Sequence, residues 1–155
     1  MALENKAAQP VAPMVVGQRA LVLDTNVVLD LLVFADPSTA PLPRLLQSGV
    51  LRWIATAQMR AELERVLAYP QIAPRLLLCE RSAAQVLARF DAGACLVDAA
   101  PRCTAVCKDQ DDQPFIDLAV AHSALLLSKD KAVLQLRKRL LACGAEVARA
   151  WVLPH

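Results

Sequence analysis

The run Ala20-Leu21-Val22-Leu23-Asp24-Thr25-Asn26 decides the fold class, because a wholly apolar stretch passes directly into polar residues. A short, continuous apolar run is typical of a strand buried on both faces of a parallel sheet. The same pattern returns at 124–127, and Asp130 follows it after two intervening residues. Ligands of open α/β sheets gather at the carboxyl ends of strands, so Asp24 and Asp130 are candidates for one site.

Other segments continue this alternation of strands and helices. Further strands are expected at 51–55, 96–97 and 146–152. Helices are expected at 43–47, 58–68, 72–78, 82–90, 112–122 and 131–142, with a helix or buried loop at 27–33. The pattern is clearest in 58–68, where Met59, Leu63 and Val66 recur on one face and Thr56 is placed to cap the helix. Strands alternating with helices indicate an α/β protein with a parallel sheet.

Length and composition favour one packed domain. The chain has 155 residues, of which 56% are hydrophobic and 21% charged, and a chain of this size buries roughly 70% of its unfolded surface. We expect a flexible N-terminal tail over 1–18, which has Pro and Ala without periodicity, and one domain over 19–155. No apolar run approaches the ~18–20 residues that cross a bilayer, and the N-terminus is a poor secretory signal. A cytoplasmic protein with no membrane association is therefore expected.

Cysteines and charge narrow the chemistry. The five cysteines are scattered, and Cys103 and Cys107 lack the second ligand pair that a structural zinc site needs, so reduced, mostly buried thiols are expected. The net charge of +2 defines no partner. Acidic residues bunch at 109–117, however, and basic residues follow at 129–139. A basic surface beside an acidic site suits a polyanion, although the run 137–139 alone is equally typical of a solvated helix face.

Four acids are candidate metal ligands, and each also has a simpler interpretation. Asp24 and Asp130 could merely cap the helices that follow them. Asp112 begins a predicted helix and lies on its inward side, whereas Asp117 points nearly opposite; Asp112 too could be only an N-cap. Glu62 flanks the apolar face of its helix, which favours it weakly over Glu64, and either could be an exposed helix acid.

Carboxylates that converge need a reason to do so. Packed carboxylates repel one another, and burying several without compensation is costly. A divalent cation removes that cost, and oxygen ligands select Mg²⁺ or Mn²⁺. A bound ion also lowers the pKa of a coordinated water and can hold the attacking and leaving oxygens of a phosphodiester. The acids therefore predict a metal-dependent hydrolase.

Four short motifs, in this order and spacing, resemble those of PIN-domain nucleases. They are Leu23-Asp24-Thr25-Asn26, Ala61-Glu62-Leu63-Glu64-Arg65-Val66-Leu67, Cys107-Lys108-Asp109-Gln110-Asp111-Asp112-Gln113-Pro114-Phe115 and Leu127-Ser128-Lys129-Asp130-Lys131. The resemblance covers about residues 20–153 and is nearest to the branch that comprises toxins of toxin–antitoxin pairs. It implies a three-layer α/β/α sandwich, dependence on Mg²⁺ or Mn²⁺, cleavage of single-stranded RNA, frequent homodimerisation and a cognate antitoxin protein.

The resemblance also assigns roles to individual residues. It implies that the catalytic and metal-binding acids are Asp24, Glu62, Asp112 and Asp130. Supporting residues would be Asn26, Ser128, Asp109 and Asp117. Lys129 stands where the family has a small or polar residue, and Lys129 and Lys131 are predicted, from charge and position, to bind the substrate backbone.

Three other acid-centred interpretations compete with a nuclease. A calcium loop over 109–120 fails, because Pro114 stands where that loop needs Gly and Val120 where it needs Glu. A phosphoaspartate phosphatase needs a second Asp at position 26, which is Asn. The remaining alternative is a PIN-like module that binds RNA or protein without cutting. Loss of cleavage on changing Asp24 would separate an enzyme from such a module, and so would stabilisation by Mn²⁺, which a binding module should hardly show.

Overall fold

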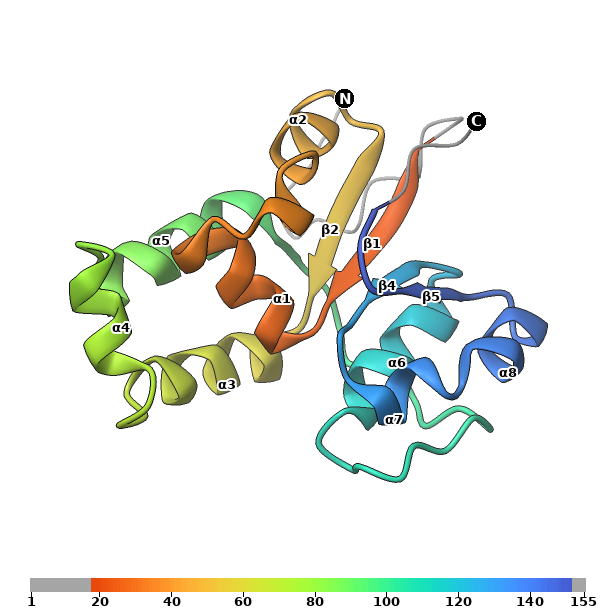
Figure 1. Cartoon of the computed structure of the whole chain (residues 1–155). Coiled ribbons are helices and arrows are strands. Elements are labelled where there is room, and N and C mark those ends of the chain that lie inside the picture. The colour runs from red at the N-terminus through yellow and green to blue at the C-terminus, as the bar shows by residue number, and fades with distance from the viewer. Residues whose placement is uncertain (1–17, 152–155) are drawn as a thin grey trace.

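The computed structural model describes residues 18–151, and its strands form one five-stranded sheet in the order β3-β2-β1-β4-β5 (Figure 1). Every neighbouring pair is parallel. The strands are β1 (Arg19–Leu23), β2 (Leu51–Ala55), β3 (Cys95–Leu96), β4 (Leu125–Leu127) and β5 (Glu146–Ala148). Because all strands run the same way, their carboxyl ends meet at one edge of the sheet.

Helices cover both faces of this sheet, as Figure 1 shows. One face carries α1 (Thr25–Leu29), α2 (Leu42–Gln47), α3 (Ala57–Leu67), α4 (Ala73–Leu78) and α5 (Ala83–Gly93), together with the π-helix η1 (Asp30–Phe34) and the 3-10 helix η2 (Pro37–Thr39). The other face carries α6 (Gln113–Ala121), α7 (Lys131–Leu134) and α8 (Arg137–Ala142). The predicted three-layer α/β/α sandwich is confirmed.

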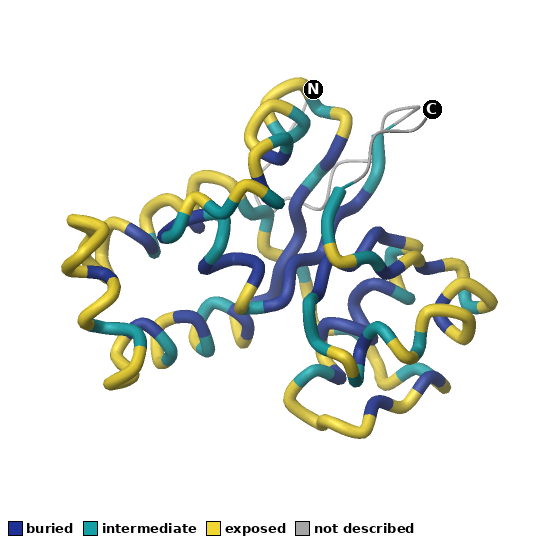
Figure 2. The backbone as a smooth tube through the Cα atoms, in the orientation of Figure 1, coloured by how far each residue is buried: buried dark blue, intermediate teal, exposed yellow. Residues whose placement is uncertain are grey.

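The core follows the continuous apolar runs of the sequence. Leu21, Val22 and Leu126 are fully buried, and Figure 2 shows buried residues running through the central strands while the outer helices are exposed. Trp53 of β2 packs edge-on against Phe90 of α5, with ring centroids 5.1 Å apart. Residues 20–23 of β1 and all residues of β4 are buried, which explains why the sequence is apolar over both segments.

Most predicted elements are found within a residue or two, and the exceptions are instructive. Strand 51–55 is exact, whereas the helix predicted over 131–142 is wrong: the chain forms two helices, α7 and α8, that break at 135–136. The last strand ends at Ala148 rather than at 152, and residues beyond 151 lie outside the described part. Residues 1–17 of the predicted N-terminal tail also lie outside the described part. All five cysteines are free, but only Cys107 is buried, so the expectation of mostly buried thiols is wrong.

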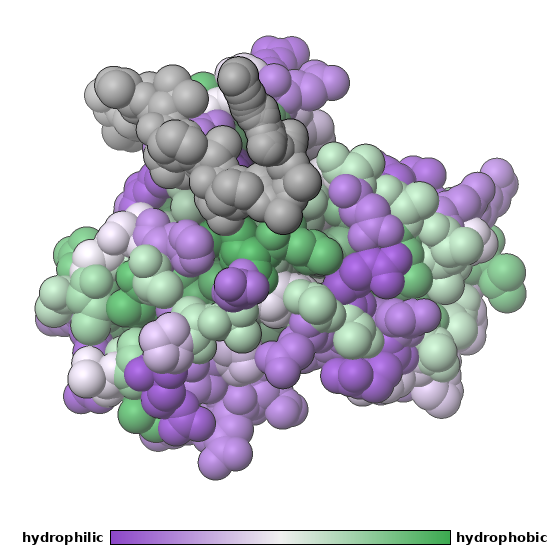
Figure 3. Space-filling model, turned by 180° about the vertical axis from the view of Figure 1, so that it is seen from behind, coloured by the Kyte–Doolittle hydropathy of each residue, from purple (hydrophilic) through white to green (hydrophobic). Residues whose placement is uncertain are grey.

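The surface carries many hydrophilic side chains, as expected of a chain that buries its apolar residues between the sheet and its two helical layers. Seen from behind, hydrophilic side chains predominate along the lower edge of the molecule, while apolar ones gather nearer the middle (Figure 3). Among residues 18–151, none of the helices has the length and apolar character needed to cross a membrane.

Candidate metal centre

Asp24 and Ser128 lie at the carboxyl ends of two neighbouring strands, β1 and β4, whose following helices pack on opposite faces of the sheet. β1 and β4 are neighbours with Leu23 opposite Leu127, but the helix after β1 goes to one face of the sheet and the helix after β4 to the other. In open α/β sheets this divergence leaves a crevice that takes ligands. The Ser128 hydroxyl donates to Asp24 Oδ2, and both side chains are buried.

Three further carboxylates gather beside this pair. Asp109, Asp112 and Asp130 each offer an oxygen within 4.8 Å of the others. Asp130 caps α7, since its Oδ1 accepts from the backbone N–H of Ala132 at 2.8 Å. Asp112 occupies the N-cap position of α6 but makes no capping hydrogen bond. Its Oδ2 is buried and receives no hydrogen bond from any described residue. The simple capping interpretation is therefore insufficient for Asp112.

Electrostatic strain accompanies this arrangement. The pKa of Asp112 is raised to about 7, first by burial and then by Asp130, whose carboxylate accepts a hydrogen bond from protonated Asp112 and repels the charged form. The charges of Asp109 and Asp24 add to this. Burial also raises the pKa of Asp24, against the opposing effect of hydrogen bonds from Ser128 and Val27. A cation placed among these oxygens would lower the pKa values of both acids, because it favours the charged form of a carboxylate.

Glu62 reaches the same cleft from the opposite side. The hydroxyl of Thr25 donates to Glu62 Oε2 at 2.8 Å, which ties α3 to the start of α1. A cleft of ≈ 320 Å³ is lined by Asp24, Glu62 and Asp112 together. Glu64 is exposed and does not line this cleft. The structure thus brings Glu62, and not its neighbour, toward the other acids.

The remaining predicted residues take varied positions. Asn26 lines the cleft and is exposed. Asp117 is buried with an 8% exposed surface, and its Oδ1 accepts from the backbone N–H of Cys103 at 3.0 Å and from Gln113 Nε2 at 2.9 Å. It therefore holds the chain segment before α6 instead of facing the cluster.

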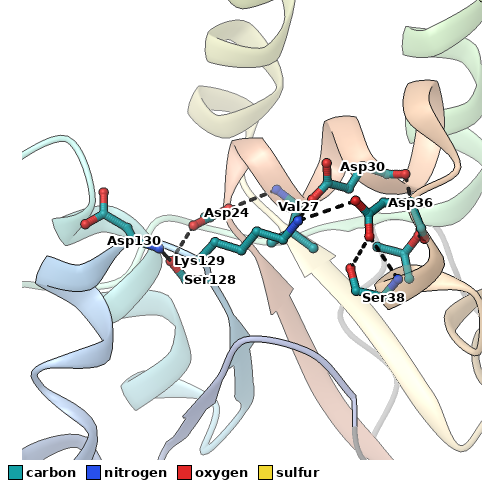
Figure 4. A network of polar contacts seen from close by, with 9 residues as sticks. Asp24, Val27, Asp30, Asp36, Ser38, Ser128, Lys129 and Asp130 are labelled. Atoms are coloured by element: carbon teal, nitrogen blue, oxygen red, sulfur yellow. Dashed lines mark hydrogen bonds and ion pairs between the residues drawn. The ribbon is translucent and has the colours of Figure 1, made fainter.

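The two predicted substrate-binding lysines differ in their surroundings. Lys129 Nζ lies 2.5 Å from Asp30 Oδ2 and 3.7 Å from Asp36 Oδ2. Figure 4 shows its side chain reaching from the end of β4 past Asp24 to these two acids, with Asp130 on the other side. Lys131 is exposed and makes no ion pair within residues 18–151. Of the two lysines, Lys131 can therefore bind an anion directly, whereas Lys129 must first break its ion pair with Asp30.

Sequence reasoning missed other residues of the cleft. Thr25, Tyr69 and Gln71 also line it. Thr25 could have been found, because it stands inside the Asp-Thr-Asn motif. The other two lie beyond the end of α3 and carry no such signal, since their place depends on how α3 and α4 connect. The half-exposed ring of Tyr69, the one tyrosine of the chain, offers the cleft an aromatic surface.

The residues present suit a hard divalent cation. All the candidate donors are carboxylate oxygens, which Mg²⁺ and Mn²⁺ prefer over sulfur or imidazole donors. The buried, unpartnered Oδ2 of Asp112 is the group whose burial such an ion would compensate. No hydrogen-bond donor of the described protein does this instead.

The fold and the site together define an α/β/α protein with an acidic centre at the carboxyl edge of a parallel sheet. Residues 20–132 match the PIN domain family, and the chain belongs to that family. PIN domains are generally nucleases that bind nucleic acid and use divalent metal ions. A search of curated proteins found no match. The matched region runs from β1 to the start of α7 and so contains all four predicted catalytic acids.

Proposed function

We propose that this protein is a divalent-metal-dependent endoribonuclease that hydrolyses phosphodiester bonds of single-stranded RNA. The observation that carries the proposal is the buried Oδ2 of Asp112, which has no donor and faces a carboxylate cluster beside an open cleft. Burying an unpaired carboxylate oxygen among other carboxylates costs free energy, and a bound cation would compensate that cost.

Four acids would hold the metal: Asp24, Glu62, Asp112 and Asp130. A Mg²⁺ or Mn²⁺ ion bound there supplies an activated water and neutralises charge on the phosphate. Asp24 and Asp112 are the nearest to direct ligands, because both line the cleft and burial raises the pKa of both carboxyl groups. Glu62 and Asp130 act directly or through water, and Asp109 is close enough to join them.

The supporting residues orient these acids. Ser128 fixes one oxygen of Asp24, and Val27 N–H fixes the other at 3.0 Å, so the carboxylate cannot rotate. Thr25 holds Glu62 in the same way. Asn26 borders the cleft, and Asp117 acts through the segment it holds. Lys131 contacts the substrate backbone, and Lys129 does so once it leaves Asp30.

The biological role extends this proposal on the resemblance alone. The protein would be the toxin of a toxin–antitoxin pair in the cytoplasm, a homodimer held inactive by an antitoxin that covers the acidic cleft. Co-purification with the product of the adjacent gene, with loss of cleavage on binding, tests this step. Failure of that test leaves the nuclease proposal intact.

Cleavage of a labelled oligouridylate separates the enzyme from a non-catalytic RNA- or protein-binding module. We expect Mn²⁺-dependent cleavage that EDTA abolishes. Asp24→Asn and Asp112→Asn should each lower the rate by at least about 100-fold, since each removes a charge from the metal site. Asp98→Asn is the matched control, because Asp98 is exposed and outside the cluster. If Asp24→Asn cleaves at the rate of the unaltered protein, the site assignment is wrong.

A further inference from the structure

A second, wider groove adjoins the acid cluster on the side of α7 and α8. It has a volume of ≈ 590 Å³ and is lined by Val106, Lys108, Ala132, Gln135, Leu136, Lys138 and Arg139. These residues come from the segment before α6, from α7 and from α8, which lie side by side at the lower right of Figure 1. The break between α7 and α8, which divides the predicted single helix, shapes one wall of this groove.

The charge of this groove is uncompensated. Lys108, Lys138 and Arg139 are all exposed, and no carboxylate lines the groove with them. Within residues 18–151, none of these three cations has an ion-pair partner. Among the described residues, three cations elsewhere do form ion pairs: Lys129 with Asp30, Arg19 with Glu146 at 2.7 Å and Arg60 with Asp91 at 2.7 Å. The groove therefore presents three free positive charges to solvent.

The position of the groove ties it to the acid cluster. Lys108 immediately precedes Asp109 of the cluster, and Ala132 lies two residues after Asp130. The groove thus begins where the cluster ends. Asp112 belongs both to the cluster and to the lining of the cleft that holds Asp24 and Glu62. The acid cluster therefore borders both the cleft and the groove.

We propose that the groove binds the sugar–phosphate backbone of the RNA strand on one side of the bond that is cut. Lys108, Lys138 and Arg139 would each neutralise phosphate charge, which requires exposed cations and no base-specific contacts. This inference rests on the proposed function for the identity of the strand. Phosphates recur along such a strand, so cations spread over α8 and the segment before α6 can act on it together.

An acidic peptide is the competing occupant, and the lining argues against it. Acidic peptide motifs are recognised by clusters of Arg, which bind a carboxylate through two parallel hydrogen bonds. This groove has a single Arg among its three cations and contains no aromatic side chain. A site that binds the RNA backbone regardless of sequence needs exposed positive charge and no pockets for particular side chains.

Salt-dependent binding tests the groove directly. The probe is a fluorescently labelled oligouridylate, and the buffer contains EDTA so that cleavage does not interfere. We compare the unaltered protein with the triple variant Lys108→Gln/Lys138→Gln/Arg139→Gln. The dependence of log K on log salt concentration should weaken by about 2, because each neutralised phosphate of a single strand contributes about 0.7. Affinity at low salt should fall by roughly 10-fold or more.

Arg44→Gln is the matched control, because Arg44 is an exposed cation on α2, on the opposite face of the sheet. It should leave both affinity and salt dependence unchanged. All four substituted side chains are exposed, and an unaltered melting temperature verifies folding. The control removes one charge and the triple variant three, so a change in the salt dependence of the control about a third as large as that of the triple variant would mean that net charge alone matters, and the groove assignment would be wrong.

The outcomes separate this inference from the proposed function. If the protein binds RNA through the groove but never cleaves it with Mn²⁺, the groove stands and the enzyme does not. If the protein cleaves and the triple variant keeps the KM and salt dependence of the unaltered protein, the enzyme stands and the groove is wrong. Competition by polyglutamate as effective as that by oligouridylate, or no RNA binding at all, would also overturn the groove assignment.

Discussion

Asp24 uses its two carboxylate oxygens for two purposes. Oδ1 accepts the backbone N–H of Val27 and thereby begins α1, while Oδ2 accepts the hydroxyl of Ser128. Ser128 Oγ in turn accepts the backbone N–H of Asp130 at 3.1 Å. Capping and site formation are thus the same set of bonds, so the simple and the functional interpretations of Asp24 do not compete.

Replacing Ser128 tests this coupling. Ser128→Ala removes the donor to Asp24 and the acceptor for Asp130 N–H, both buried or nearly so. Unfolding free energy should fall by about 1–3 kcal/mol, and Mn²⁺ affinity by roughly 10-fold or more, because the ligand loses the group that orients it. Denaturant unfolding and metal titration by calorimetry measure the two effects. Ser123→Ala, at an exposed position, is the control and should change neither; a Ser128→Ala protein with unaltered metal affinity would contradict the coupling.

Asp112 predicts a pH dependence of stability in the metal-free protein. Its pKa is about 7 in the folded state against an ordinary 3.8, so the folded protein holds the proton more strongly. Stability should therefore be greatest below about pH 4 for this group and fall as the pH rises to about 7. Asp112→Asn should abolish that fall and be more stable at pH 8 by on the order of 2 kcal/mol.

Urea unfolding at a series of pH values in EDTA measures this difference. Asp98→Asn is again the control, since its carboxylate is exposed. A difference between Asp112→Asn and the unaltered protein that stays constant from pH 4 to 8 would mean that Asp112 has an ordinary pKa.

At the scale of elements, α6 and the segment before it behave as one unit. Gln113, the first residue of α6, accepts from the backbone N–H of Cys107 at 2.7 Å and donates to the carbonyl of Ala105 at 2.9 Å. Asp117, one turn later, accepts from Gln113 and from Cys103 N–H. These buried bonds hold a segment without regular structure, and that segment carries Lys108 and Asp109.

Asp117 is predicted to act on stability more than on catalysis. Asp117→Ala leaves two donors without an acceptor, which should cost about 2–3 kcal/mol of unfolding free energy. Because Asp117 does not face the metal centre, cleavage by the folded variant should fall less than about 10-fold, against at least about 100-fold for Asp112→Asn. Thermal unfolding and cleavage well below the melting temperature separate the effects. A rate loss as large as that of Asp112→Asn would make Asp117 part of the metal site.

Sequence patterns predict an element well where the whole segment is buried, and poorly where contacts with distant segments determine where the element begins or ends. The segments 20–23, 53–55 and 125–127 are wholly apolar, so the positions of β1, β2 and β4 follow from the sequence. The division of 131–142 into α7 and α8 does not, since the helical period continues through Gln135. The contacts of Lys129 with Asp30 and of Asp117 with Cys103 join segments distant in sequence, and no local pattern indicates them.

At the scale of the whole molecule, the centre lies between two sets of helices that the chain builds separately. Glu62 comes from one face of the sheet and Asp112 from the other, and only the parallel edge of β1 and β4 brings them to one cleft. Lys129 crosses the same boundary from the end of β4 to η1. The carboxylates repel across this boundary, so a cation among them should stabilise the entire fold.

Metal binding should therefore raise the melting temperature, and more at high pH than at low pH. Mn²⁺ at about 100 times its dissociation constant stabilises a folded site by ≈ 2.7 kcal/mol, which for a chain of this length corresponds to about 5–10 °C. At pH 5.5 the proton on Asp112 competes with the metal, because the pKa of that acid is about 7. The same Mn²⁺ concentration should then give about a third of the shift. Differential scanning fluorimetry at pH 5.5 and 8 measures this, and EDTA should reverse it. The Asp24→Asn/Asp112→Asn variant should show little response at either pH, while Asp98→Asn should match the unaltered protein; an equal shift in all three would place the metal elsewhere.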